Sequence, residues 1–136
     1  MQRLFSILLL LLFTSPVLAG VVIIANPDNS ELVLGHSEVE RIYLGKMTHW
    51  SDDSGIVPVM LKNGATHEAF LDEYMNRTVH RFVSYWRQMV FTGKGIPPKT
   101  FTDDAELAAY VARTPGAVGY VSEKTSLSGV KVLKIR

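Results

Sequence analysis

Short β-branched apolar runs alternate along this chain with longer stretches of helical periodicity, and that alternation limits the folds open to it. The strand-like runs are Gly20–Asn26, Gly55–Leu61, 114–121 and 129–135. Apolar residues at helical spacing fall in the segments 36–46, 62–75, 78–90 and 102–113. The resulting order, β-α-β-α-α-α-β-β, predicts an α/β domain with a small mixed sheet flanked by helices.

Several residues predict where these helices begin and end. Gly45 stands where a glycine commonly follows the last helical turn. Hydroxyl and carboxylate side chains at helix starts can accept hydrogen bonds from the free backbone N–H groups. The expected caps are Thr66, Thr78, the pair Ser37 and Glu40, and the pair Asp103 and Glu106.

Two further patterns concern packing. One face of the helix predicted at 78–90 carries the apolar residues Val79, Phe82, Val83, Trp86 and Val90. This spacing favours Trp86 as a core residue over a ligand platform. Pro58 lacks a backbone N–H for the sheet ladder, so it predicts that Gly55–Leu61 is an edge strand or contains a bulge.

Residues 1–19 have the pattern of an export signal. Arg3 gives a positive start, Leu4–Phe13 is apolar, and Val17 and Ala19 are the small residues expected before a cleavage site. The apolar run is too short to cross a bilayer as a helix, which favours a cleaved signal over the alternative of a retained anchor. We therefore expect cleavage after Ala19 and one exported domain, 20–136.

Composition and motifs argue against several classes of function. The chain has 14 Lys and Arg against 13 Asp and Glu, and loss of Arg3 with the signal would leave a neutral domain, which argues against nucleic acid as a partner. Without cysteine there are no disulfides, thiol chemistry or iron–sulfur clusters. The four histidines lack metal-ligand spacing, and no G-x-S-x-G motif occurs. We expect no catalytic residue, metal or cofactor, and keep a hydrolase only as a third alternative.

The segment KNGATHEAF contains the candidate binding site. A glycine-containing turn leads there from a strand directly into a helix, where free backbone N–H groups and the helix dipole favour an anion. The candidate ligand-binding residues are Lys62, Asn63, Gly64, Ala65 and Thr66. The alternative is that this junction binds nothing and that Thr66 serves only as a helix cap.

Three separated segments resemble the phosphate-binding receptors of ABC transporters. IYLGKMTHWSD, beginning at Ile42, is similar to their I-(F/Y)-x-G-K-x-x-x-W-x-D segment. The segment from Trp86 to Val121 is similar to their W…G-x-G…P-G-(A/S)-I-G-Y-V segment, and KNGATHEAF stands where they carry D-G-S-G-T. The resemblance implies a lobe of a type II periplasmic-binding-protein-like fold, a periplasmic location, a small oxyanion such as phosphate or sulfate as ligand, and structural roles for Trp50 and Asp52.

Departures from that pattern imply a short, single-lobe relative with weak binding. The N-terminal T-G-(A/S)-G-S-S loop of the family is absent, and Met60, Lys62 and Gly64 replace its Arg, Asp and Ser. Loss of the Arg and Ser removes strong bonds to an anion, which Lys62 would partly replace. Two functions stay open: weak oxyanion binding, or a ligand-free interaction module that partners a sensor, a transporter or a second copy.

Overall fold

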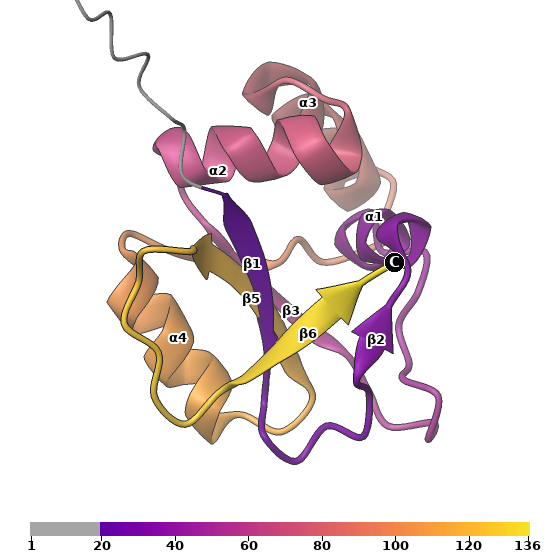
Figure 1. Cartoon of the computed structure of the whole chain (residues 1–136). Helices are drawn as coiled ribbons and strands as arrows, with labels where there is room; N and C mark the ends of the chain where they lie inside the picture. Colours follow the sequence, from indigo (N-terminus) through magenta and orange to yellow (C-terminus); the bar gives the residue numbers. More distant parts are fainter. Residues whose placement is uncertain (1–19) are drawn as a thin grey trace, which may run out of the picture.

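The computed structural model describes residues 20–136, so the predicted export signal and its cleavage site lie outside the described residues. Figure 1 shows helices arranged around one sheet. The strands are β1 (Val21–Ala25), β2 (Val33–Leu34), β3 (Val57–Leu61), β4 (Lys99–Phe101), β5 (Ala117–Ser122) and β6 (Lys131–Ile135). The helices are α1 (His36–Tyr43), α2 (Ala65–Phe70), its π-helical continuation η1 (Leu71–Met75), α3 (Val79–Phe91) and α4 (Asp104–Arg113).

The strands form one six-stranded mixed sheet in the order β2-β6-β1-β5-β3-β4. β1 runs antiparallel to both of its neighbours, β5 and β6. The pairs β2 with β6, β3 with β5 and β3 with β4 are parallel. The predicted α/β class with a small mixed sheet is therefore confirmed.

Two short strands, β2 and β4, are not predicted by the sequence. β2 is held by its neighbour, because the Lys134 N–H donates to the Leu32 carbonyl at 3.1 Å and the Arg136 N–H to the Leu34 carbonyl at 3.1 Å. β4 pairs with β3 and receives the Lys62 N–H on the Phe101 carbonyl at 2.8 Å. Strands of two or three residues depend on such partners more than on their own sequence.

Pro58 lies in β3, which has a partner strand on each side, so the prediction of an edge strand is wrong. The Val57 N–H donates to the Gly116 carbonyl on the β5 side at 2.9 Å. Successive N–H groups of a strand face opposite neighbours, so the Pro58 nitrogen faces the β4 side. β4 pairs only from Val59 onward, and Pro58 therefore removes no bond from the ladder.

Three of the predicted helix boundaries are confirmed. The Thr78 Oγ1 accepts the Arg81 N–H at 3.2 Å at the start of α3. The Asp103 Oδ1 accepts the Glu106 N–H at 2.7 Å at the start of α4. Gly45 follows α1 with a φ of 73°, in the left-handed region that glycine adopts at little cost.

The capping pair predicted for α1 is wrong. The N-cap of α1 is Gly35, and its N–H donates to the Glu38 carboxylate at 2.9 Å. Ser37 and Glu40 have the right spacing but lie two residues further along the chain. A glycine cap has no side-chain acceptor, so the usual Ser, Thr, Asp or Asn signal is absent at position 35.

The core fills both faces of the sheet. On one face Gly119 of β5 lies under α4, because a Cβ built at Gly119 would be 2.6 Å from a methyl group of Leu107. On the other face the Tyr120 ring stacks on Phe70 of α2, with ring centroids 3.8 Å apart, and meets the edge of Tyr43 of α1. Neighbouring residues of β5 thus serve opposite layers, and the core lies within the described residues.

Helix α3 packs on the end of α1 through two aromatic residues. The Trp86 Nε1 donates to the Tyr43 carbonyl at 3.1 Å, and the Tyr85 hydroxyl donates to the Leu44 carbonyl at 2.6 Å. Trp86 is buried, which confirms its predicted core position. Only Phe82 and Trp86 of this apolar face are buried, so a core position for Val83 is wrong, and Val79 and Val90 are exposed as well. No helix in the span 20–136 is long and apolar enough to cross a membrane.

Candidate functional site

The predicted anion-binding residues occupy the turn between β3 and α2. β3 ends at Leu61, and α2 begins at Ala65 with Gly64 as its N-cap. Gly64 has a φ of 100°, a conformation that L side chains rarely adopt, so this turn requires a glycine. The Lys62 N–H donates to the Phe101 carbonyl, which ties the start of the turn to β4. The structure therefore brings all five predicted residues into one short, anchored segment.

The backbone donors of this turn are not used inside the domain. The N–H groups of Asn63, Gly64, Ala65 and Thr66 make no hydrogen bond to any residue of the span 20–136. Thr66 does not cap α2, so that prediction is wrong, and its hydroxyl makes no hydrogen bond with any described residue. Lys62, Asn63, Gly64 and Ala65 are exposed, and Thr66 is half-buried. The turn therefore presents free donors at an open surface.

A buried pair of side chains supports the turn from below. The Tyr120 hydroxyl accepts the Leu61 N–H at 3.1 Å and makes a short hydrogen bond of 2.5 Å to Nδ1 of His67. Burial lowers the pKa of His67, outweighing the opposite effect of Glu68, and burial raises the pKa of Tyr120 well above its usual range. His67 and Tyr120 are therefore both neutral at pH 7, so the pair supports the turn without adding charge to it.

The sequence analysis missed this supporting pair. His67 and Tyr120 are separated by 53 positions, and no local pattern connects them. The adjacent residues His67 and Glu68 do diverge, with His67 buried and Glu68 exposed, as expected of neighbours on a helix.

The charge around the turn is mixed. Lys62 is exposed and can approach an anion, whereas Glu68 lies in the first turn of α2 and opposes one there. Met60, which occupies the position of the family's Arg, is half-buried and lines an apolar pocket with Phe82 and Trp86. The turn can therefore offer backbone donors, a hydroxyl and one cation to a small anion.

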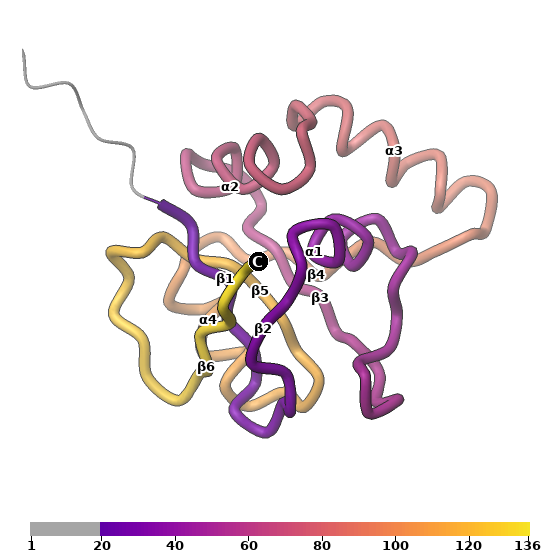
Figure 2. Tube along the Cα trace, turned by 45° about the vertical axis from the view of Figure 1, so that its right-hand side comes forward, coloured from indigo at the N-terminus to yellow at the C-terminus, as the bar shows by residue number. Residues whose placement is uncertain are grey.

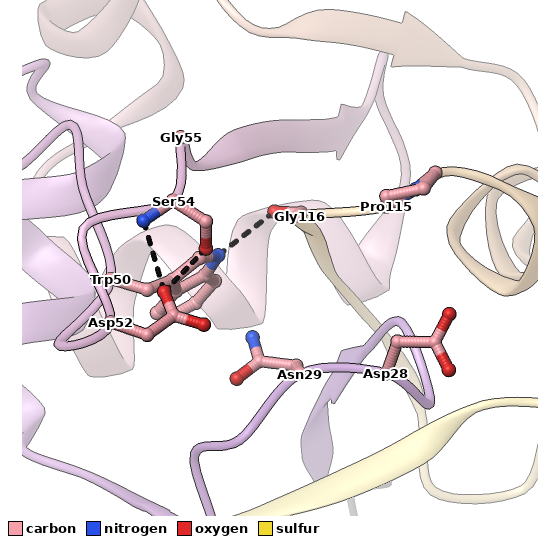
Figure 3. Close-up of a pocket in the computed structure, with 8 residues that line it drawn as sticks. All are labelled: Asp28, Asn29, Trp50, Asp52, Ser54, Gly55, Pro115 and Gly116. Atoms are coloured by element: carbon pink, nitrogen blue, oxygen red, sulfur yellow. Dashed lines mark hydrogen bonds between the residues drawn. The ribbon is translucent and has the colours of Figure 1, made fainter.

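A second cavity, of about 360 Å³, lies at the opposite end of β3 (Figure 3). The Trp50 Nε1 donates to the Gly116 carbonyl there at 3.2 Å, and Trp50 is buried. The Ser54 N–H and hydroxyl both donate to the Asp52 carboxylate, and these bonds lower the pKa of Asp52. These contacts confirm that Trp50 and Asp52 are structural residues.

The same cavity contains a polar group without a partner. The Asn29 Nδ2 is buried and makes no hydrogen bond to any described residue, and Figure 3 shows it turned toward the cavity. The cavity is large enough to hold water that would satisfy this donor. Throughout residues 20–136, this cavity included, no group of three or more His, Asp or Glu residues is close enough together to hold a metal ion.

Comparisons with known proteins identify the family. The model of the PBP superfamily domain PBP_like_2 matches residues 12–132. Among solved structures, a protein described as a phosphate ABC transporter substrate-binding protein with bound phosphate from Clostridium perfringens has a TM-score of 0.67 at 19% identity, over 86% of this chain and 45% of that one. An ABC-type phosphate transport receptor from Vibrio cholerae has a TM-score of 0.65 at 19% identity, over 86% and 46%. PstS from Borrelia burgdorferi has a TM-score of 0.66 at 14% identity, over 87% and 47%.

These solved structures establish the fold of the chain. A comparison with curated proteins gives no match. The chain spans a little under half the length of each of the three solved proteins. Its six-stranded sheet with flanking helices corresponds to one lobe of the periplasmic-binding-protein fold. The chain therefore belongs to the PBP superfamily, and it shares its fold with part of the solved proteins described as phosphate ABC transporter substrate-binding proteins or receptors.

Proposed function

We propose that this protein is an exported solute-binding-like domain that binds a small oxyanion, such as phosphate or sulfate, weakly at the Lys62–Thr66 turn. The observation that carries the proposal is the row of unused N–H groups from Asn63 to Thr66. Backbone donors at the start of a helix favour anions, and the Thr66 hydroxyl and the Lys62 ammonium add to them. The protein described with bound phosphate shares this fold.

Binding is expected to be weak because the site is open and lacks the family's Arg and Ser. Water and salt screen contacts on an exposed turn, and Glu68 opposes an anion in the first turn of α2. A few exposed charge-assisted bonds contributing about 4 kcal/mol together correspond to a Kd of about 1 mM. We therefore propose recognition of an abundant solute rather than tight capture.

The remaining parts of the proposal follow from the relatives. They are described as substrate-binding proteins, so we propose that this chain binds its ligand without catalysing a reaction. We also propose a periplasmic location after cleavage at Ala19, with a membrane transporter or a sensor as partner. The ligand-free interaction module remains the alternative function.

An NMR titration of ¹⁵N-labelled 20–136 with sodium phosphate and sodium sulfate at low ionic strength tests the site. We expect the amide signals of Asn63, Gly64, Ala65 and Thr66 to move and saturate at millimolar anion. Lys62→Gln should weaken binding several-fold, whereas Lys46→Gln, which removes an exposed charge at the end of α1, should not. Unmoved turn signals at concentrations well above the expected Kd would reject oxyanion binding in favour of the interaction module.

A further inference from the structure

The outer side of α3 leaves several large apolar side chains in solvent. Phe91 and the loop residue Ile96 are each 90% exposed, and Val83 and Val90 are 45% and 52% exposed. Figure 2 shows α3 running outward from α2, so that its C-terminal end and the following loop form one extremity of the trace. We call the surface formed by Val83, Arg87, Val90, Phe91, Lys94 and Ile96 the α3 tip.

The helical part of the α3 tip forms one surface. Residues 83, 87 and 90 lie four and seven positions apart, which places them on one side of the helix. Val83, Arg87, Val90 and Phe91 line one open groove of about 430 Å³ together with Trp86 and Pro97. Trp86 is the buried residue of this groove, and its hydrogen bond to the Tyr43 carbonyl fixes the position of its ring.

The two charged residues of the α3 tip, Arg87 and Lys94, are both cations. Residues 77–100 contain five Arg and Lys residues and no Asp or Glu, although the whole chain is nearly neutral. Arg87 and Lys94 are exposed and form no ion pair with any residue in 20–136. Arg77 shares one surface hollow with Glu68 and Asp72, and Arg77 and Arg81 share another with Glu40, so the unpaired cations of the tip itself are Arg87 and Lys94. The α3 tip therefore combines protruding apolar groups with unpaired cations.

We propose that the α3 tip docks the domain on the surface of an anionic lipid bilayer. Apolar side chains that enter the headgroup region and cations that meet anionic lipids are the two forces that hold peripheral proteins on membranes. A uniformly anionic surface complements a segment that has no acidic residue. A second copy of this chain is a poorer occupant, because a symmetric interface would bring the same cations together. This proposal does not depend on oxyanion binding at the Lys62–Thr66 turn.

Vesicle cosedimentation of 20–136 tests the proposal, using vesicles of phosphatidylglycerol mixed with phosphatidylcholine against vesicles of phosphatidylcholine alone. Binding is expected only to the anionic vesicles and should weaken as salt increases. The double variant Phe91→Ser/Ile96→Ser should lower the partition coefficient about tenfold, because it removes the inserted apolar area. Arg87→Gln/Lys94→Gln should lower it by a similar factor of roughly ten.

Two matched controls separate these effects from general surface changes. Leu32→Ser removes an apolar side chain that is 70% exposed and lies next to β2, and Lys46→Gln removes an exposed charge outside the tip. Neither should change vesicle binding. Circular dichroism of each variant checks that the fold is retained, and the phosphate titration of the turn should be unaffected by the tip variants.

A single fluorescent label gives an independent measurement, because the chain has no cysteine of its own. An environment-sensitive dye on Thr92→Cys should shift to the blue with anionic vesicles, and the same dye on Val132→Cys, on β6, should not. Equal binding to both vesicle types, no binding, or tip variants that behave like the controls would overturn the proposal. So would a concentration-dependent dimer, or a complex with an acidic protein, that disappears in Phe91→Ser/Ile96→Ser without any vesicle binding.

Discussion

Replacement of Tyr120 by Phe tests the buried support of the candidate site. The substitution removes one oxygen atom and keeps the ring that stacks on Phe70. The Tyr120 hydroxyl accepts the Leu61 N–H and is hydrogen-bonded to Nδ1 of His67, and all three residues are almost completely buried. Tyr120→Phe therefore leaves a backbone donor and a ring nitrogen without partners and without access to water.

The expected loss of stability follows from these two groups. A buried polar group left without a partner costs about 1–3 kcal/mol. Two such groups, partly relieved by small shifts, give an expected decrease of about 2–4 kcal/mol in the free energy of unfolding. That is a large share of the stability of a small domain.

Urea unfolding followed by circular dichroism measures the change in the free energy of unfolding. An unchanged dependence of that free energy on urea concentration would show that the variant exposes as much surface on unfolding as the wild type does. Tyr110→Phe is the matched control, because the Tyr110 hydroxyl makes no hydrogen bond with any residue in 20–136 and the residue is half-buried. It should change stability by less than about 0.5 kcal/mol. If Tyr120→Phe costs no more than Tyr110→Phe, the hydroxyl does not bridge β3 and α2 and the reasoning fails.

Three further predictions concern the rest of the fold. Burial lowers the pKa of His67 in the folded state, so the unfolded chain binds a proton more readily, and the free energy of unfolding should fall as the pH drops below about 6.5. Chemical unfolding of His67→Gln over the same pH range should show a weaker dependence on pH. Gly119→Ala should lower the unfolding free energy by about 1–3 kcal/mol in urea, because its new methyl group would overlap Leu107, and a wild-type midpoint would refute the tight packing of α4. Asp103→Ala should cost about 1 kcal/mol by thermal unfolding, since it leaves the Glu106 N–H without its cap, whereas Asp103→Asn should retain most of that stability.

The longer strands were predictable because their signals are local. The runs that become β1 and β3 are β-branched and bounded by turn residues, and they appear where expected. β2 and β4 carry no such signal, because they are too short to show periodicity and exist only through pairing with β6 and β3. Pro58 is a similar case, because whether it removes a hydrogen bond from the sheet depends on where the neighbouring strand β4 begins to pair.

The candidate site also combines a feature that the local sequence predicts with one that it does not. The glycine turn from Lys62 to Thr66 was predicted from the sequence, and Gly64 has the positive φ that explains its presence. The hydrogen bond between His67 and Tyr120 could not be predicted, because it joins positions 53 residues apart. The prediction of Thr66 as a cap is wrong because the N-cap of α2 is Gly64, two residues before Thr66.

The sequence by itself determined the order of the main elements, the glycine turn and the family, because periodicity, turn chemistry and motif spacing act over a few residues. Only the tertiary structure decided the strand order, the buried Tyr120–His67 support and which side of α3 faces solvent. The apolar spacing of α3 favoured a core position for Val83 as well as Phe82 and Trp86, yet only Phe82 and Trp86 are buried. Helical periodicity defines a face, and the neighbouring elements determine how much of that face is covered.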